Sequence, residues 1–157
     1  MNDEQDKFLT YWFDGFINGL RQVDGNAQDA ILRECGLACA RSFTARAFQE
    51  ARRGSDSLEG FLIRLAEKFP GTAFEAVDEQ TIRVSYAQCY CDLVKQGWVK
   101  SPLLCKCSTY NLKQNFEGSL GRPVRVKLIS SILGGAEKCS LEVVLLDEDV
   151  QPMENHG

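Results

Sequence analysis

The chain has 157 residues, of which 44% are hydrophobic and 25% charged, and its formal net charge is −4. These values are typical of one globular domain with a core, and the lack of a lysine/arginine block excludes nucleic acid as a partner. No apolar run approaches the roughly 18 residues that span a bilayer, and the acidic start is unlike a signal peptide. We therefore expect a single cytoplasmic domain over residues 1–157, with no membrane partner.

Residues 1–70 carry the period of helices. Apolar residues recur through 6–21 at helical spacing, and this stripe is rich in aromatics, including Trp12 and Phe16. The favoured interpretation is a helix that faces the core. The alternatives are a dimer face or the floor of an apolar pocket.

A second helix is predicted over about 27–52. Ile31, Cys35, Cys39 and Phe43 fall at steps of four, so they share one face of that helix. Free cysteine is often a small buried hydrophobe. We therefore expect Cys35 and Cys39 to lie in the core, with a place in a functional site as the alternative.

A third helix is predicted after 54–57. Asp56 and Glu59 have the spacing of a capping box, which marks the start of a helix. Leu62 and Leu65 lie on its apolar face, and Pro70 ends it.

Residues 71–147 change to the period of strands. Apolar and polar residues alternate in 82–86, 124–128 and 139–145, and 72–77 is a plausible partner strand. A helix over 108–119, with Ser108 as its N-cap, separates the two pairs. The fold class is therefore α+β: N-terminal helices followed by β-β-α-β-β, with an antiparallel sheet covered by helices on one face. Residues 148–157 are expected to be a frayed acidic tail.

The seven cysteines are an odd number, so they cannot all pair within the chain. Five of them form the candidate metal site: Cys89, Cys91, Cys105, Cys107 and Cys139. The first four are two Cys-X-Cys pairs, and each pair in extended chain directs two sulfurs the same way. Four thiolates bind zinc at about 2.3 Å, and an iron–sulfur cluster is a less favoured cofactor because the spacing of ferredoxins is absent.

The single histidine, His156, stands in the predicted tail. A Cys-His dyad or a Cys/His zinc site needs a histidine inside the fold, so any metal here must be held mainly by thiolates. Three interpretations of the cysteines stay open: a metal or ligand site, buried reduced thiols, and a redox-active or nucleophilic group.

Residues 102–145 contain an ordered set of features: Cys105 before a helix, a Gly-Arg-Pro-Val strand entry at 121–124, a Gly-Gly turn at 134–135 and then Cys139. This set resembles the 4-vinyl reductase domain, also called the hydrocarbon-binding domain. The resemblance implies an α+β domain that dimerises and encloses an apolar pocket. Such domains serve as ligand-sensing modules or as accessory proteins in pigment or hydrocarbon metabolism.

In phenol-sensing members of that family, cysteines and a glutamate hold zinc near the pocket. Cys105 and Cys139 match two of those cysteines, but the Glu-X-X-Cys pair falls on Leu128 and Ser131 here. The resemblance therefore implies an incomplete zinc site unless Cys107, Cys89 or Cys91 supplies the missing ligands.

A second stretch, Cys35-Gly-Leu-Ala-Cys39-Ala, is similar to bacterial proteins related to aminothiazoline-carboxylate hydrolases. This resemblance implies a cysteine nucleophile. With no histidine in the fold, the helix N-terminus near Cys107 is the remaining device that would lower a thiol pKa.

The leading hypothesis is a module that binds a small apolar or aromatic molecule between the aromatic helix and the sheet, as a homodimer. The predicted pocket residues are Trp12, Phe16, Cys35, Cys39, Trp98 and Phe116. The alternatives are a cysteine-dependent hydrolase or reductase and an interaction domain with inert thiols. The balance is against an enzyme, and no catalytic residue is assigned.

Overall fold

The computed structural model describes residues 2–147, so the predicted tail at 148–157 lies outside the described residues. The elements, in chain order, are α1 (Asp3–Leu20), α2 (Gly25–Cys39), the π-helix η1 (Ala40–Thr44), α3 (Ala45–Arg53), α4 (Leu58–Lys68), β1 (Thr72–Ala76), β2 (Thr81–Tyr86), α5 (Asp92–Lys95), the 3₁₀ helix η2 (Pro102–Cys105), α6 (Lys106–Leu120), β3 (Val124–Ser130) and β4 (Cys139–Leu145).

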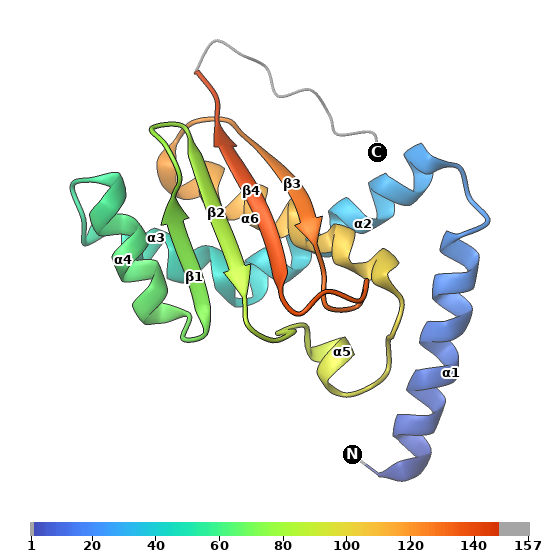
Figure 1. Cartoon of the computed structure of the whole chain (residues 1–157). Coiled ribbons are helices and arrows are strands. Elements are labelled where there is room, and N and C mark those ends of the chain that lie inside the picture. The colour runs from blue at the N-terminus through green and yellow to red at the C-terminus, as the bar shows by residue number, and fades with distance from the viewer. Residues whose placement is uncertain (1, 148–157) are drawn as a thin grey trace.

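The four strands form one antiparallel sheet in the order β1-β2-β4-β3 (Figure 1). One face is apolar: Ile82 and Val126 both pair with Val143 across neighbouring strands. On the other face, Glu142 lies opposite both Arg83 and Lys127. Helices α3, α4 and α6 cover the apolar face, which confirms the predicted α+β class with a sheet covered on one side.

The second predicted helix exists, but α2, η1 and α3 divide it among them. Asp24 caps its start, because the Ala27 amide donates to the Asp24 carboxylate at 2.9 Å. The predicted inward face is wrong. Leu32, Gly36 and Ala40 form the buried face. Cys35 and Cys39, the two cysteines expected in the core, are exposed, as are Ile31 and Phe43 on the same face. The physical reason is that small residues at 36 and 40 let this face approach α6 closely.

Two predicted helix starts are displaced. At α4, Ser57 rather than Asp56 is the N-cap, and its hydroxyl accepts from the Gly60 amide at 3.0 Å. At α6, the helix begins at Lys106 rather than after Ser108, because the 3₁₀ turn η2 leads directly into it. The predicted C-terminus holds, with Gly121 in the left-handed region at φ 67°.

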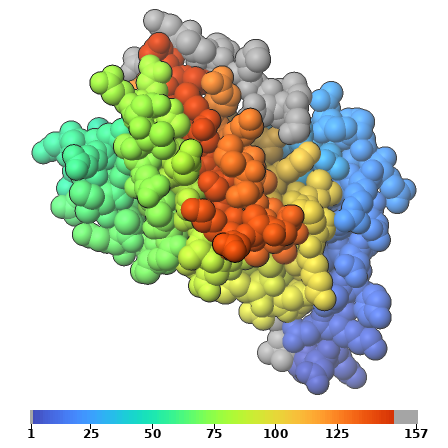
Figure 2. All heavy atoms as spheres, viewed as in Figure 1, coloured from blue at the N-terminus to red at the C-terminus, as the bar shows by residue number. Residues whose placement is uncertain are grey.

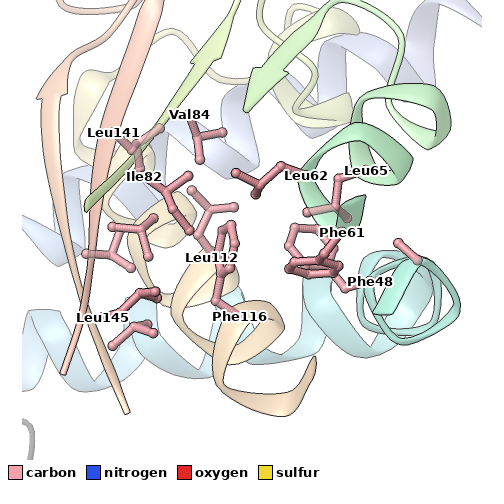
Figure 3. Close-up of a cluster of buried hydrophobic side chains, with 14 residues drawn as sticks. Phe48, Phe61, Leu62, Leu65, Ile82, Val84, Leu112, Phe116, Leu141 and Leu145 are labelled. Carbon is pink, nitrogen blue, oxygen red and sulfur yellow. The ribbon is translucent and has the colours of Figure 1, made fainter. Parts of the chain in front are cut away.

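The main core lies between the sheet and the helices. Phe116 of α6 packs edge-on against Phe48 of α3 and Phe61 of α4, with ring centroids 5.2 and 6.1 Å apart. Figure 3 shows these rings facing Ile82, Val84 and Leu141 of the sheet. Aromatic side chains of this size each bury 150–250 Å² in general, so this group anchors the helices to the sheet.

A second apolar cluster holds α1 to the body. Its buried members come from α1, α2, the segment between α5 and η2, and η2 itself: Ile17, Leu20, Leu32, Val99 and Leu104. Helix α1 therefore packs beside the sheet rather than over it (Figures 1 and 2). Within residues 2–147, no helix has the length and apolar character that a membrane crossing requires.

Candidate functional site

All seven cysteines gather in one region of the fold. Cys35 and Cys39 lie in the last turns of α2, and Cys89 and Cys91 precede α5. The other three are Cys105 at the end of η2, Cys107 in the first turn of α6 and Cys139 at the start of β4. When one of these thiols ionises, its negative charge raises the pKa of a neighbouring thiol. Such effects connect each of the seven to at least one other, so they form one cluster. We call these seven residues the thiol cluster.

Cys107 lies at the centre of this cluster. Burial is the main cause that raises its pKa to about 12, and the neighbouring thiols of Cys35, Cys91, Cys39 and Cys105 raise it further. The expectation that the N-terminus of α6 lowers the pKa of Cys107 is therefore wrong. Desolvation of the sulfur, which packs against the second apolar cluster, outweighs the helix dipole.

Cys105 and Cys139 lie at the other side of the cluster, next to the turn between β3 and β4. Burial raises the pKa of Cys105, and a hydrogen bond from the Ser131 side chain opposes that shift. The Ile132 amide donates to the Cys139 sulfur at 3.3 Å. Ser131 is the position where the family resemblance implies a cysteine, so the hydroxyl stands beside Cys105 in the place of a further thiol.

The thiols are neighbours without forming a prepared metal site. Across residues 2–147, no group of three or more His, Cys, Asp or Glu side chains is placed to hold a metal ion. All seven cysteines are free thiols. The soft sulfur donors suit zinc chemically, but their present arrangement does not direct three of them at one point.

The predicted interpretation of Cys35 and Cys39 as core residues is wrong, since both are exposed. Although Cys39 as a whole reaches solvent, protein atoms around its sulfur desolvate it and raise its pKa. The nearby charges of Cys91 and Asp92 add to that rise, while a hydrogen bond from Asn111 opposes it.

Helices α2 and α6 touch backbone to backbone beside the thiol cluster. A methyl group at Gly36 would lie 2.6 Å from the Cys107 carbonyl oxygen and 2.8 Å from Cβ of Tyr110. Only glycine permits this approach. The contact places the thiols of α2 next to that of Cys107, and farther along α6 the same face carries Asn111 and Asn115.

A polar network continues along this contact, which we call the α2–α6 seam. Thr44, the last residue of η1, accepts hydrogen bonds at Oγ1 from Asn115 Nδ2 at 2.9 Å and from Asn111 Nδ2 at 3.3 Å. Asn115 Nδ2 also donates to Asn111 Oδ1 at 3.0 Å. Asn115 is only 2% exposed, so these hydrogen bonds lie inside the protein.

The predicted pocket residues do not come together in one place. Trp12 stacks on Phe16 with ring centroids 5.8 Å apart, and Trp98 stacks on Phe13 at 6.3 Å, next to the second apolar cluster. Phe116 instead lies at the centre of the main core. Trp98 is held to α1 by a hydrogen bond from its Nε1 to the Asp6 carboxylate at 3.1 Å.

Sequence reasoning missed three polar residues of this region: Thr44, Asn111 and Asn115. Asn115 stands directly before Phe116 within an amphipathic helix, so its place on the inward side was available as a signal. The partner on η1 was not available, because a π-helical turn changes which side chains face α6.

No protein-family model matches the sequence, and no curated protein matches it by sequence. Solved structures do share the fold. One is the trafficking protein particle complex subunit 3 of Naegleria fowleri covalently bound to palmitic acid, with 10% identity, a TM-score of 0.52, and coverage of 94% of this chain and 98% of that one.

Another is the phenol-responsive sensory domain of the transcription activator PoxR with phenol. It has 14% identity and a TM-score of 0.52, over 78% of this chain and 75% of that one. The chain is thus similar in fold to two proteins whose structures hold a small apolar molecule.

Proposed function

We propose that this chain is a binding module for a small apolar or aromatic molecule, as the resemblance to hydrocarbon-binding domains implies. The observation that carries the proposal is the shared fold with one palmitate-bound and one phenol-bound protein. Helix α6 contributes Phe116 to the main core and Tyr110 to the second apolar cluster. The proposed ligand lies along α6, where these two apolar clusters meet the thiol cluster.

The chemistry of the thiols favours binding over catalysis. A cysteine nucleophile reacts as its thiolate. The pKa values of Cys39, Cys105 and Cys107 are all raised, chiefly by burial, so these thiols are held in the protonated form. Such groups serve better as polarisable walls of an apolar pocket than as nucleophiles.

Thermal unfolding with apolar probes tests the proposal. Phenol, toluene and palmitate are added separately, and at a concentration 100 times its Kd a bound probe stabilises the folded state by about 2.7 kcal/mol. We expect at least one probe to raise Tm while glucose leaves it unchanged. Failure of all three probes to shift Tm would contradict the binding function.

A matched pair of variants on α1 localises the site. Phe16 packs against the second apolar cluster, whereas Phe8 on the same helix is 63% exposed. We expect Phe16→Ala to weaken probe binding and Phe8→Ala to leave it unchanged. Equal effects of the two substitutions would place the ligand away from this cluster.

We further propose zinc at Cys105 and Cys139, with Cys107, Cys89 or Cys91 completing the ligand set. The support is that ionisation of Cys139, Cys89 or Cys91 would raise the pKa of Cys105, so these thiols lie close enough to interact. Binding would require the sulfurs to turn toward a common point. Elemental analysis of protein purified without chelators is expected to give one zinc per chain, lost in Cys105→Ala but retained in Cys35→Ala. A metal-free wild-type protein would contradict this proposal without touching the apolar pocket.

The homodimer implied by the family resemblance also stays a proposal. The side of α1 that turns away from the body carries Phe8, Tyr11 and Trp12, which are 63%, 68% and 54% exposed. Such a stripe would be covered in a dimer. Sedimentation velocity across a range of concentrations tests it, and a monomer at every concentration would contradict it. A cytoplasmic location remains a prediction.

A further inference from the structure

Helix α6 contains a buried polar atom that has no hydrogen-bond partner within residues 2–147. Asn115 is 2% exposed, and its Oδ1 has no hydrogen-bond partner among the described residues. A buried acceptor left unsatisfied costs about 1–3 kcal/mol, and folded proteins contain few of them. The position therefore calls for a hydrogen-bond donor that this part of the chain does not itself supply.

The hydrogen bonds around the Asn115 side-chain amide determine which of its atoms lacks a partner. Asn111 directs its Nδ2 to Thr44 Oγ1 and to the Cys39 sulfur, so its Oδ1 remains to accept from Asn115 Nδ2. The second hydrogen of Asn115 Nδ2 goes to Thr44. The Asn115 amide is thus held with its carbonyl oxygen directed away from both partners.

Thr44 owes its position to the π-helical segment. Segment η1 covers Ala40–Thr44, and the helix continues from Ala45 without a side-chain cap at Thr44. π-helical turns are rare in proteins overall, and those that do occur are often found at functional sites. Here the turn brings a hydroxyl against two asparagines of α6, which orients Asn115 from a neighbouring element.

The chemistry around the free oxygen restricts what can bind there. Its helical neighbours Leu112 and Phe116 are buried in the main core. The network of Thr44, Asn111 and Asn115 carries no charge, and a carbonyl oxygen repels an ionised carboxylate. A neutral hydroxyl group attached to an apolar body satisfies both the acceptor and its surroundings.

We infer that Asn115 is the polar anchor of the apolar-ligand site: its Oδ1 accepts a hydrogen bond from a neutral hydroxyl group of the ligand. This inference rests on the proposed binding function and makes it more specific. It assigns the ligand to alcohols or phenols rather than to ionised fatty acids. The ligand's hydroxyl end lies at the α2–α6 seam, and the thiol cluster lies farther along that seam.

The test compares phenol with toluene, which has nearly the same shape but no hydroxyl group. Kd values for both probes are measured by NMR titration of wild type, Asn115→Leu and Gln114→Leu. Gln114 is exposed on the same helix, so it is the matched control. In Asn115→Leu, we expect the affinity for phenol relative to toluene to fall about tenfold, which corresponds to about 1.4 kcal/mol or one hydrogen bond. In Gln114→Leu, the ratio should equal that of wild type.

The outcomes separate this inference from the function on which it rests. If both probes bind and the ratio is the same in all three proteins, the anchor is wrong while the binding function stands. If neither probe binds the wild type, the binding function fails for these probes and the anchor fails with it.

A second measurement covers the case in which Asn115→Leu does not fold. In wild-type protein labelled with ¹³C, the side-chain carbonyl carbon of Asn115 should shift on addition of phenol and not of toluene. A crystal structure with phenol that shows a buried water retained on Asn115 Oδ1, and phenol elsewhere, would overturn the inference.

Discussion

The thiols of this protein differ in pKa because their surroundings differ. Cys107 packs against the second apolar cluster, and burial with neighbouring thiols raises its pKa to about 12. Burial also raises the pKa of Cys105, but a hydrogen bond from the Ser131 hydroxyl opposes that shift. The surroundings of each thiol therefore set how strongly it holds its proton.

The raised pKa of Cys107 predicts a loss of stability at alkaline pH. Above 9.0, the ordinary pKa, the thiol ionises in the unfolded chain while the folded protein keeps its proton up to about 12. The unfolded state then binds fewer protons, so stability falls as pH rises, at up to about 1.4 kcal/mol per pH unit. Urea unfolding at several pH values should show a shallower fall in Cys107→Ala than in wild type.

Phe8→Ala, which removes an exposed side chain that does not titrate, is the control for that series. Its stability curve should stay parallel to that of wild type. Parallel curves for Cys107→Ala as well would show that this thiol does not carry the effect.

At the scale of elements, the crossing of α2 and α6 organises the site. Gly36 allows the two backbones to touch. This contact places the thiols of α2 beside Cys107 of α6 and brings Asn111 within reach of Thr44. The crossing is close because Gly36 has no side chain, so an added methyl group meets backbone atoms that cannot rotate away.

Gly36→Ala should therefore destabilise the protein. In an open helix this substitution stabilises by up to about 1 kcal/mol, but the clash at 2.6 Å with the Cys107 carbonyl reverses the sign, with an expected cost of about 1–3 kcal/mol. Gly118→Ala on α6 has no atom within 4 Å of the new methyl group and should stabilise. Chemical denaturation measures both, and a stabilised Gly36→Ala would contradict the close crossing.

At the scale of the molecule, α6 joins two apolar clusters into one body. Its Leu112 and Phe116 lie in the main core, and its Cys107 and Tyr110 pack on the second cluster. The sheet packs on α6 through the main core, and α1 packs on α6 through the second apolar cluster. A ligand along α6 would thus contact both parts of the structure.

Loss of the central ring should destabilise the whole molecule. Phe116→Ala removes a fully buried side chain that contacts Phe48 and Phe61, so the expected cost is about 3–5 kcal/mol. Phe8→Ala removes the same group from an exposed position and should change stability by less than about 0.5 kcal/mol. Equilibrium unfolding of both variants checks this, and similar costs would contradict the assigned core.

The sequence by itself determined the kinds of elements and their order, because the 3.6-residue and two-residue periods are local properties of the chain. It predicted the α+β class and the two strand pairs. Its prediction for the inward face of the long helix was wrong, since Gly36 and Ala40 face α6 while Cys35 and Cys39 reach solvent.

Only the tertiary structure decided what meets at the site. The gathering of all seven thiols, the raised pKa of Cys107 and the Asn115 oxygen without a partner among residues 2–147 arise from contacts between segments far apart in the chain. A thiol's desolvation and an amide's missing partner depend on neighbours that no local period encodes. These two properties, burial and hydrogen-bond satisfaction, are the ones that define the proposed ligand.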